Sequence, residues 1–182
     1  MKVAFVFPGQ GAQYVGMGHE VYSKFEEARA AFDEADGALD FPISRLCFEG
    51  PEEELKLTEN TQPAILTTSI ALFRILKKKG IRPDYVAGHS LGEYSALVAA
   101  GALKLSDAAA LVRRRGRYMQ EAVPVGTGAM AAVLGGALSE IQRVCGEASQ
   151  GQVCSVANFN APNQTVIAGN TEAVDQIGRA HV

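Results

Sequence analysis

The sequence predicts an α/β fold in two parts, residues 1–125 and residues 126–182. Three observations predict it: an apolar run that ends in Pro-Gly, a strand joined to a helix by a tight glycine turn, and a change of element order in the second part. We expect the first part to contain buried parallel strands and helices. The second part is expected to follow the β-α-β-β-α order of a ferredoxin-like unit without its last strand.

The first part opens with a strand. Residues 3–7 form a continuous run of apolar, β-branched and aromatic side chains, and Pro8-Gly9 closes it. Such a run is typical of a fully buried strand in a parallel sheet. Apolar residues then recur at helical spacing from Val21 to Phe32, until Gly37 interrupts the pattern. From there to about residue 60 we expect short irregular or helical connections.

The remaining elements follow from the same kinds of signal. The segment 62–79 keeps apolar residues on one side, ends in three lysines and stops at Gly80, as helices commonly do. A short strand at 85–87 leads through a glycine turn into a helix that ends near Ala100. A further helix is expected at 106–121, before a linker of proline and glycine. In the second part, strands are expected at 129–134, 153–159 and 165–168, with helices at 139–148 and from Thr171 onward.

Composition restricts the class of protein. With 182 residues, 47% of them hydrophobic and 20% charged, the chain is long enough to bury a core. The formal net charge of -3 gives no reason to expect a nucleic-acid partner, and no apolar stretch has the length of a membrane span or a signal-peptide core. The three cysteines match neither a disulfide framework nor a zinc motif, so we expect reduced thiols. A soluble cytoplasmic protein is therefore expected.

The glycine turn at 88–92 is the strongest candidate site. Gly88-x-Ser90-x-Gly92 lies between a short strand and a helix, which is the pattern of a nucleophile elbow that exposes a serine hydroxyl. The helix that begins at Leu91 directs free N–H groups at the reacting centre, so the N–H of Leu91 is a candidate oxyanion donor. The short motif also arises by chance in a chain with 19 glycines. Its position between strand and helix favours the elbow.

A second glycine loop, residues 8–11, follows the first strand. Loops at the carboxyl end of a parallel strand gather around ligand sites, so this loop is expected near the elbow. The N–H of Gln10 is then a candidate for the second oxyanion donor. A simple glycine turn explains the loop equally well. Its spacing misses the third glycine of a dinucleotide-binding fingerprint.

An arginine points inward from the predicted helix at 106–121. At about 100° per residue, Arg115 falls near the middle of an apolar arc, and Arg113 and Arg117 fall on the opposite face. An inward guanidinium stays charged and must be paired. Either a carboxylate of the protein meets it or it awaits the carboxylate of a ligand. The arc consists of Ala108, Leu111, Val112, Tyr118 and Met119.

The histidines offer no convincing general base for Ser90. His89 is adjacent to the serine, and neighbouring side chains in a sharp turn point apart, so a packed or hydrogen-bonded structural histidine is the better interpretation. His19 lies on the polar side of the first helix pattern, and His181 is one residue from the chain end.

Several blocks of the sequence occur in a recognisable order. They are FVFPGQGAQ near the start, TQPAI at 61–65, GHSLGEYSAL at 88–97, RGRYMQEAVPVGTGAMAAV at 115–133 and NFNAPNQTVIAG at 158–169. Together they strongly resemble the malonyl-CoA:acyl-carrier-protein transacylase family over essentially the whole chain. Several blocks in order are far more specific than the glycine-serine-glycine motif alone.

The resemblance implies a fold and a reaction. Family members combine an α/β-hydrolase-like large domain with an inserted ferredoxin-like small domain, and both are expected to be incomplete in this chain. They move a malonyl group from coenzyme A to the phosphopantetheine thiol of acyl carrier protein through a malonyl-serine ester, in fatty acid biosynthesis. The implied substrate is malonyl-CoA, and the resemblance implies no cofactor and no metal.

The resemblance also implies roles for particular residues and for partners. By position in its motif, Ser90 matches the family nucleophile, and Gln10 and Leu91 match the backbone oxyanion donors. Arg115 matches the arginine that binds the malonyl carboxylate. The implied partners are malonyl-CoA and acyl carrier protein, with neither nucleic acid nor membrane.

One part of the family pattern is not found. The family pairs its serine with a histidine well downstream, and His181 falls where the family is still in a small-domain helix. We expect the chain to lack this base, to be inactive alone, and to expose a sheet edge and apolar helix faces that favour association. The start at Met1, directly on the first strand, favours a stand-alone enzyme. Alternatives are a serine hydrolase or thioesterase, a polyketide-synthase-type acyltransferase, and a non-catalytic remnant.

Overall fold

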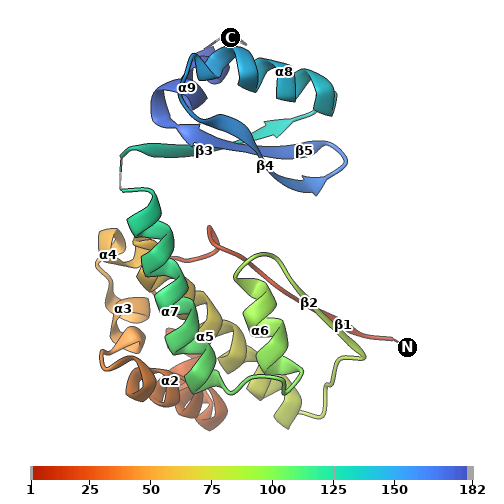
Figure 1. Ribbon diagram of the computed structural model, residues 1–182. Helices are drawn as coiled ribbons and strands as arrows, with labels where there is room; N and C mark the ends of the chain where they lie inside the picture. Colours follow the sequence, from red (N-terminus) through yellow and green to blue (C-terminus); the bar gives the residue numbers. More distant parts are fainter. Residues whose placement is uncertain (1, 125, 180–182) are drawn as a thin grey trace. The chain divides into compact units, whose positions relative to one another are not determined.

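The chain has a mixed α/β fold in two compact units. The computed structural model describes residues 2–124 and 126–179, and the units divide between Gln120 and Glu121 (Figure 1). The sequence placed this division at residues 125 and 126, in the linker of proline and glycine that follows the last helix of the first unit. Within the described residues, no helix combines the length and the apolar character that crossing a membrane requires.

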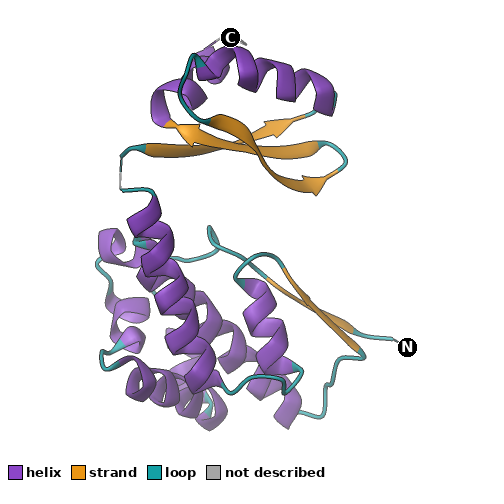
Figure 2. Ribbon diagram, in the orientation of Figure 1, coloured by secondary structure: helices purple, strands orange, loops and turns teal. Residues whose placement is uncertain are grey.

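The first unit consists of helices on one side of a short pair of strands (Figure 2). Strands β1 (Ala4–Phe7) and β2 (Tyr85–Gly88) pair in parallel, with Phe7 opposite Gly88. The stretch from Gly37 to about residue 60, which was expected to be irregular or helical, contains the short helices α3 (Ile43–Glu49) and α4 (Glu52–Lys56). The helices are α1 (His19–Lys24), α2 (Glu26–Leu39), α3 (Ile43–Glu49), α4 (Glu52–Lys56), α5 (Thr58–Lys78), α6 (Gly92–Ala99) and α7 (Leu105–Ala122).

The core of the first unit forms around α5. Leu66 and Ile70 of α5 pack in one cluster with Phe32 of α2 and with Leu105 and Val112 of α7, and all five side chains are fully buried. Burying an apolar side chain of this size stabilises the folded state by about 1.5–3 kcal/mol. The core thus fixes α5 and α7, the helices that carry polar side chains to the candidate site described below.

Strand β1 is covered on one face only, so the expectation of a fully buried strand is wrong. Phe5 and Phe7 face helices, where Phe7 packs with Phe73 and Ala96. Val6, which points to the other face, is 74% exposed. Side chains alternate along a strand, so an apolar run is buried throughout only where both faces are covered. Within the described residues this sheet has β1 and β2 alone, and the exposed sheet edge expected from the sequence is present.

The buried side of α7 also differs from the predicted arc. Leu111, Tyr118 and Met119, expected inside, are 44%, 61% and 44% exposed. Small residues decide the orientation instead, because they let the backbones of two elements approach. A Cβ on Gly116 would lie 2.6 Å from the Cα of Glu59. The buried residues of α7 are Leu105, Ala108, Ala109, Val112 and Gly116.

The prediction that Arg113 lies on the face of α7 opposite the apolar arc, away from the packed side, is wrong. The side chain is half-buried, with its guanidinium carbon 3.9 Å from the ring centroid of Phe41, and it donates a 2.9 Å hydrogen bond to the carbonyl oxygen of Leu39. Burial lowers the pKa of this guanidinium. Arg117 does lie on the exposed side, where it pairs with Glu59 at 3.3 Å. Arg113 therefore contributes to packing, and only Arg117 behaves as predicted.

The second unit is an antiparallel sheet with helices, and its strands β3 (Gly128–Leu134), β4 (Cys154–Ala161) and β5 (Gln164–Asn170) lie in the order β3-β5-β4. Strands β4 and β5 form a hairpin with a shorter turn than the expected 160–163. One face of the sheet and the helices share a small core, formed by the buried side chains of Ile141, Cys145, Ile167 and Val174. The elements are β3 (Gly128–Leu134), α8 (Leu138–Ser149), β4 (Cys154–Ala161), β5 (Gln164–Asn170) and α9 (Thr171–Arg179), in the order that the sequence predicts.

The cysteines are reduced, as expected. Cys47 is buried in the first unit, and Cys145 and Cys154 lie in the second, all three as free thiols. Burial raises the pKa of the Cys47 thiol to about 12. None of the three is therefore a disulfide link in the fold.

Candidate active site

The turn between β2 and α6 has the geometry of a nucleophile elbow. The N–H of His89 donates to the carbonyl oxygen of Phe7 at 3.2 Å, and the N–H of Gly92 donates back to the carbonyl oxygen of His89 at 2.8 Å. Ser90 has a φ of 51° and an exposed side chain. A residue other than glycine in this left-handed region carries strain of about 1–3 kcal/mol, which is typical of functional sites. The turn thus holds the Ser90 hydroxyl out of the backbone.

Both glycines of the motif are required by close backbone contacts. A Cβ on Gly88 would lie 1.9 Å from the carbonyl carbon of Gly92. A Cβ on Gly92 would lie 2.2 Å from the carbonyl oxygen of Phe7 and 2.8 Å from that of Pro8. No side chain fits at these separations, so the spacing of the motif follows from the crossing of β1, β2 and α6.

Two backbone N–H groups near Ser90 remain free for a ligand. Within residues 2–124 and 126–179, the N–H groups of Gln10 and Leu91 have no hydrogen-bond acceptor. Leu91 begins the turn into α6, and its side chain is 1% exposed, which fixes its backbone. Gly9 lies against the elbow, because a Cβ there would be 2.8 Å from the carbonyl oxygen of His89. The loop that carries Gln10 therefore approaches the turn that carries Ser90.

The side chain of Gln10 anchors its loop to α5. Its Nε2 donates to Oγ1 of Thr58 at 3.3 Å, and the N–H of Thr58 donates to Oε1 of Gln120 on α7 at 3.1 Å. These bonds link the loop after β1 with the first turn of α5 and with α7. The loop is thus held by side chains as well as by its glycine contacts.

Arg115 lies beside the serine. Its Nη2 donates to Oγ of Ser90 at 3.2 Å, and its Nη1 donates to Oε1 of Gln62 at 2.8 Å. The guanidinium carbon is 5.8 Å from the ring centroid of Tyr94. Among the described residues, no carboxylate pairs with Arg115 within 4.0 Å, although Arg117 on the same helix is paired. The sequence left two partners open for Arg115, a carboxylate of the protein or the carboxylate of a ligand. The described residues supply no carboxylate of the protein in this role.

Gln62 is the site residue that the sequence reasoning missed. It lies on α5 with a side chain that is fully buried, and the amide reaches Arg115. The signal was available, because a glutamine within an otherwise apolar helix face requires a partner when it is buried. The TQPAI block supports the family resemblance but by itself assigns no role to this residue.

The rings of His89 and His19 each lie against a residue other than Ser90. The ring of His89 lies toward Gly9, since a Cβ on Gly9 would be 2.8 Å from its Nδ1. His19 packs on Phe48, with ring centroids 5.1 Å apart. His181 lies outside the described residues. His89 is exposed, so the interpretation of it as a packed histidine is not supported by its burial.

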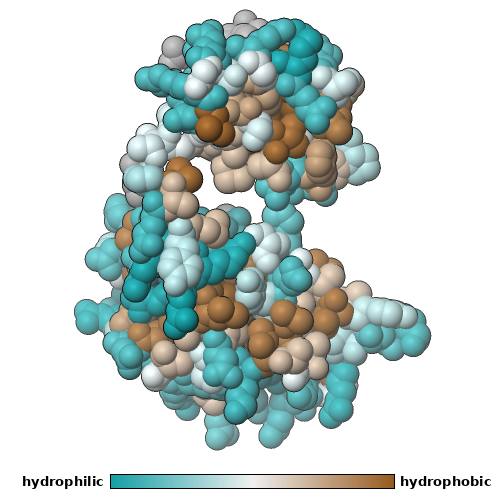
Figure 3. All heavy atoms as spheres, in the orientation of Figure 1, coloured by the Kyte–Doolittle hydropathy of each residue, from teal (hydrophilic) through white to brown (hydrophobic). Residues whose placement is uncertain are grey.

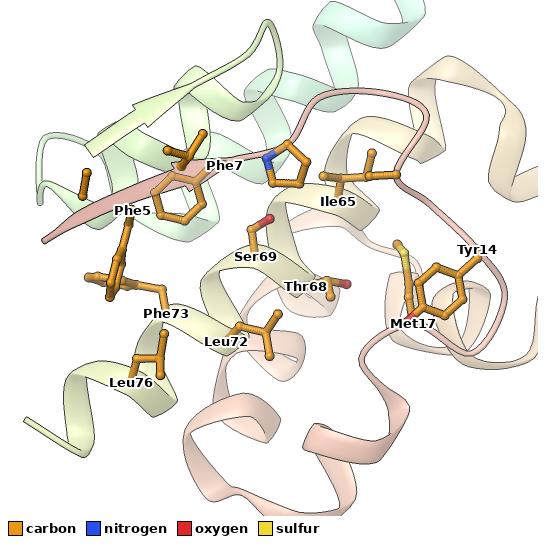
Figure 4. A pocket seen from close by; sticks show the side chains of 14 residues that line it. Phe5, Phe7, Tyr14, Met17, Ile65, Thr68, Ser69, Leu72, Phe73 and Leu76 are labelled. Carbon is orange, nitrogen blue, oxygen red and sulfur yellow. The ribbon is translucent and has the colours of Figure 1, made fainter. Parts of the chain in front are cut away.

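An apolar pocket separate from Ser90 opens between β1 and α5. Phe5 and Phe7 of β1 and Leu72 and Phe73 of α5 line it, and its volume is about 420 Å³ (Figure 4). Apolar residues also reach the surface of both units (Figure 3). The apolar faces expected from the sequence are therefore present, and Leu72 is 46% exposed.

Known proteins similar to this chain include a protein family and curated relatives. The pattern of the acyl transferase domain family matches residues 4–180. The chain is 53% identical over 175 residues to the malonyl CoA-acyl carrier protein transacylase of Bacillus subtilis (strain 168) and 52% identical over 180 residues to that of Escherichia coli (strain K12). These alignments cover 96% and 98% of this chain, but 55% and 58% of the relatives. The chain thus spans a little over half the length of the curated relatives it matches.

Solved structures agree with the sequence comparison. The malonyl CoA-acyl carrier protein transacylase of Coxiella burnetii superposes with a TM-score of 0.93 at 48% identity, covering 99% of this chain and 57% of that chain. A malonyl-transacylase solved in complex with its type II polyketide synthase acyl-carrier protein has a TM-score of 0.91 at 48% identity, covering 99% of this chain and 59% of that chain. The resemblance inferred from the sequence blocks is confirmed.

Proposed function

Because the chain belongs to the acyl transferase domain family, we propose that it is the N-terminal part of a malonyl-CoA:acyl-carrier-protein transacylase. Ser90 is the nucleophile of this proposal, and Arg115 binds the carboxylate of the malonyl group. The observation that carries the proposal is the guanidinium of Arg115, which lies 3.2 Å from the Ser90 hydroxyl without a carboxylate partner among the described residues. A buried or half-buried positive charge beside a nucleophile suits an acyl group that is itself anionic.

The proposed reaction has two halves. In the first, Oγ of Ser90 bonds to the thioester carbonyl carbon of malonyl-CoA, the bond from carbon to sulfur breaks, and coenzyme A leaves as a thiol after taking up the serine proton. In the second, the phosphopantetheine thiol of acyl carrier protein attacks the malonyl ester and regenerates the serine. The free N–H groups of Gln10 and Leu91 support a role as donors to the carbonyl oxygen that becomes negatively charged in each half.

The proton transfers require a general base. We expect this base to be the downstream histidine that the family resemblance implies, from the portion of the relatives that the chain does not match. Without a base, a serine hydroxyl is a weak nucleophile at neutral pH. The 182-residue chain is therefore expected to bind malonyl-CoA but to transfer the malonyl group far more slowly than a full-length relative.

The proposal includes the finer fold and the setting. The first unit is assigned as part of an α/β-hydrolase-like catalytic domain, supported by the parallel strands and the elbow. The second is assigned as a ferredoxin-like small domain, supported by its β-α-β-β-α order. The partners are malonyl-CoA and acyl carrier protein in the cytoplasm, and no metal or cofactor takes part.

A pair of arginine variants tests the proposal. Arg115→Ala removes the positive charge beside Ser90. Arg114→Ala removes a positive charge from the preceding position of α7, which is exposed. Calorimetric titration with malonyl-CoA should show affinity reduced about tenfold or more for Arg115→Ala, because a hydrogen-bonded charge pair contributes about 1.5–3 kcal/mol. Arg114→Ala should bind like wild type. Equal affinity of wild type and Arg115→Ala for malonyl-CoA would refute the proposal.

A further inference from the structure

The side chain of Gln62 is held at both ends. Its Oε1 accepts the 2.8 Å hydrogen bond from Nη1 of Arg115, and its Nε2 lies 3.3 Å from Sδ of Met119. Gln62 is 0% exposed. Only the oxygen of an amide can accept from a guanidinium, so the bond to Arg115 fixes which way the amide points. The amide therefore has one defined orientation in the site.

The charge state of position 62 matters because of its distance from Arg115. A carboxylate at the same place would form an ion pair with the guanidinium in a partly dry environment, where such pairs are strong and costly to break. The positive charge would then be neutralised before any ligand arrived. An amide orients the guanidinium through the same geometry and leaves its charge uncompensated.

We propose that Gln62 is a specificity-determining positioning residue, which holds the Arg115 guanidinium beside the Ser90 hydroxyl while leaving its charge to the carboxylate of an acyl thioester. The inference rests on the proposed function. It predicts that the preference for an anionic over a neutral acyl group depends on the neutrality of residue 62. A guanidinium has five N–H groups, so Arg115 keeps donors for a ligand beyond the two that Gln62 and Ser90 accept.

The test compares binding of malonyl-CoA and acetyl-CoA, which differ by the carboxylate. Gln62→Glu should lower the ratio of malonyl-CoA to acetyl-CoA affinity about tenfold or more, with little change in acetyl-CoA affinity. Gln62→Met, which is neutral and of similar length, should weaken malonyl-CoA binding less and keep part of the preference. The matched control is Gln142→Glu, the same substitution at an exposed position of α8 in the other unit.

The outcomes separate this inference from the proposed function. If Arg115→Ala abolishes the preference for malonyl-CoA and Gln62→Glu keeps the wild-type ratio, the inference is wrong and the proposed function stands. If wild type has no preference for malonyl-CoA, both are wrong. Thermal melts show whether each variant is folded. If Gln62→Glu does not fold, the ratio of malonyl-CoA to acetyl-CoA affinity is taken from Gln62→Met instead. A change in stability without a change in the ratio would mean that Gln62 is structural only.

Discussion

Replacing Gly88 by alanine tests whether the elbow depends on backbone contact. Gly88 ends β2, and the start of α6 crosses directly over it. A Cβ at this position would meet the carbonyl carbon of Gly92 at 1.9 Å, its oxygen at 2.0 Å and the N of Glu93 at 2.3 Å. All three atoms belong to the backbone, so no side-chain rotation relieves the overlap. The substitution must push the first turn of α6 away from β2.

The size of the effect follows from these distances. Carbon atoms in contact lie about 3.5–4.0 Å apart, so the backbone would have to shift by more than about 1.5 Å. Forcing additional atoms into a packed site costs about 1–3 kcal/mol, and the rigid neighbours place Gly88→Ala at the upper end. For a chain of this size a loss of about 3 kcal/mol lowers the melting temperature by about 10 °C.

The assay is thermal unfolding followed by circular dichroism, with Gly37→Ala as the control. Gly37 lies in α2 on the surface, and a Cβ there meets nothing within 4 Å. Alanine should stabilise that helix by about 0.5–1 kcal/mol. A melting temperature of Gly88→Ala within about 2 °C of wild type would refute this prediction. It would mean that the backbone of Gly92 and Glu93 accommodates a Cβ at position 88 without loss of stability.

Two further substitutions and one labelling experiment test other parts of the structure. Gly116→Ala should lower the melting temperature measurably, since its Cβ would lie 2.6 Å from the carbonyl oxygen of Thr58 and from the Cα of Glu59; an unchanged melt would show that α7 and the start of α5 separate easily. Asp84→Asn should destabilise the chain at pH 7, because bonds from Val3 and Lys2 lower the pKa of Asp84. That stabilisation is present above the ordinary aspartate pKa of about 3.9 and is lost as the pH falls through the lowered value, so the two melts should converge in acid; a constant difference would contradict this. Burial raises the pKa of the Cys47 thiol to about 12, so an aromatic disulfide reagent at pH 7 should label it only after unfolding.

The elbow was predictable from the sequence because its causes are local. Gly88, Ser90 and Gly92 are close in sequence, and the turn needs its small residues at those positions whatever surrounds it. Strand β2 and helix α6 flank it as expected. The order of elements in the second unit was predictable for the same reason, since each strand and helix has its own apolar period.

The orientation of α7 was not predictable from hydropathy. A helical arc of large apolar residues suggested that Leu111 and Tyr118 are buried, yet both are exposed. What decides the packing is how closely the backbones approach, and Gly116 permits the approach to Thr58 and Glu59. Arg115 reaches the site because it is adjacent to that contact, on a helix whose predicted buried arc is correct for Ala108 and Val112 only. Gln62 went unnoticed because its partner is far away in the sequence.

Two separate backbone contacts therefore support the two tasks of the candidate site. Gly88 and Gly92 bring β1, β2 and α6 together, which sets the Ser90 hydroxyl and the free N–H groups beside it. Gly116 brings α7 against the start of α5, which sets Arg115 against Gln62. A defect at the first contact should impair acylation of every thioester, whereas a defect at the second should act mainly on thioesters that carry a carboxylate. Activation of the nucleophile and recognition of the acyl charge are thus separable by substitution at different glycines.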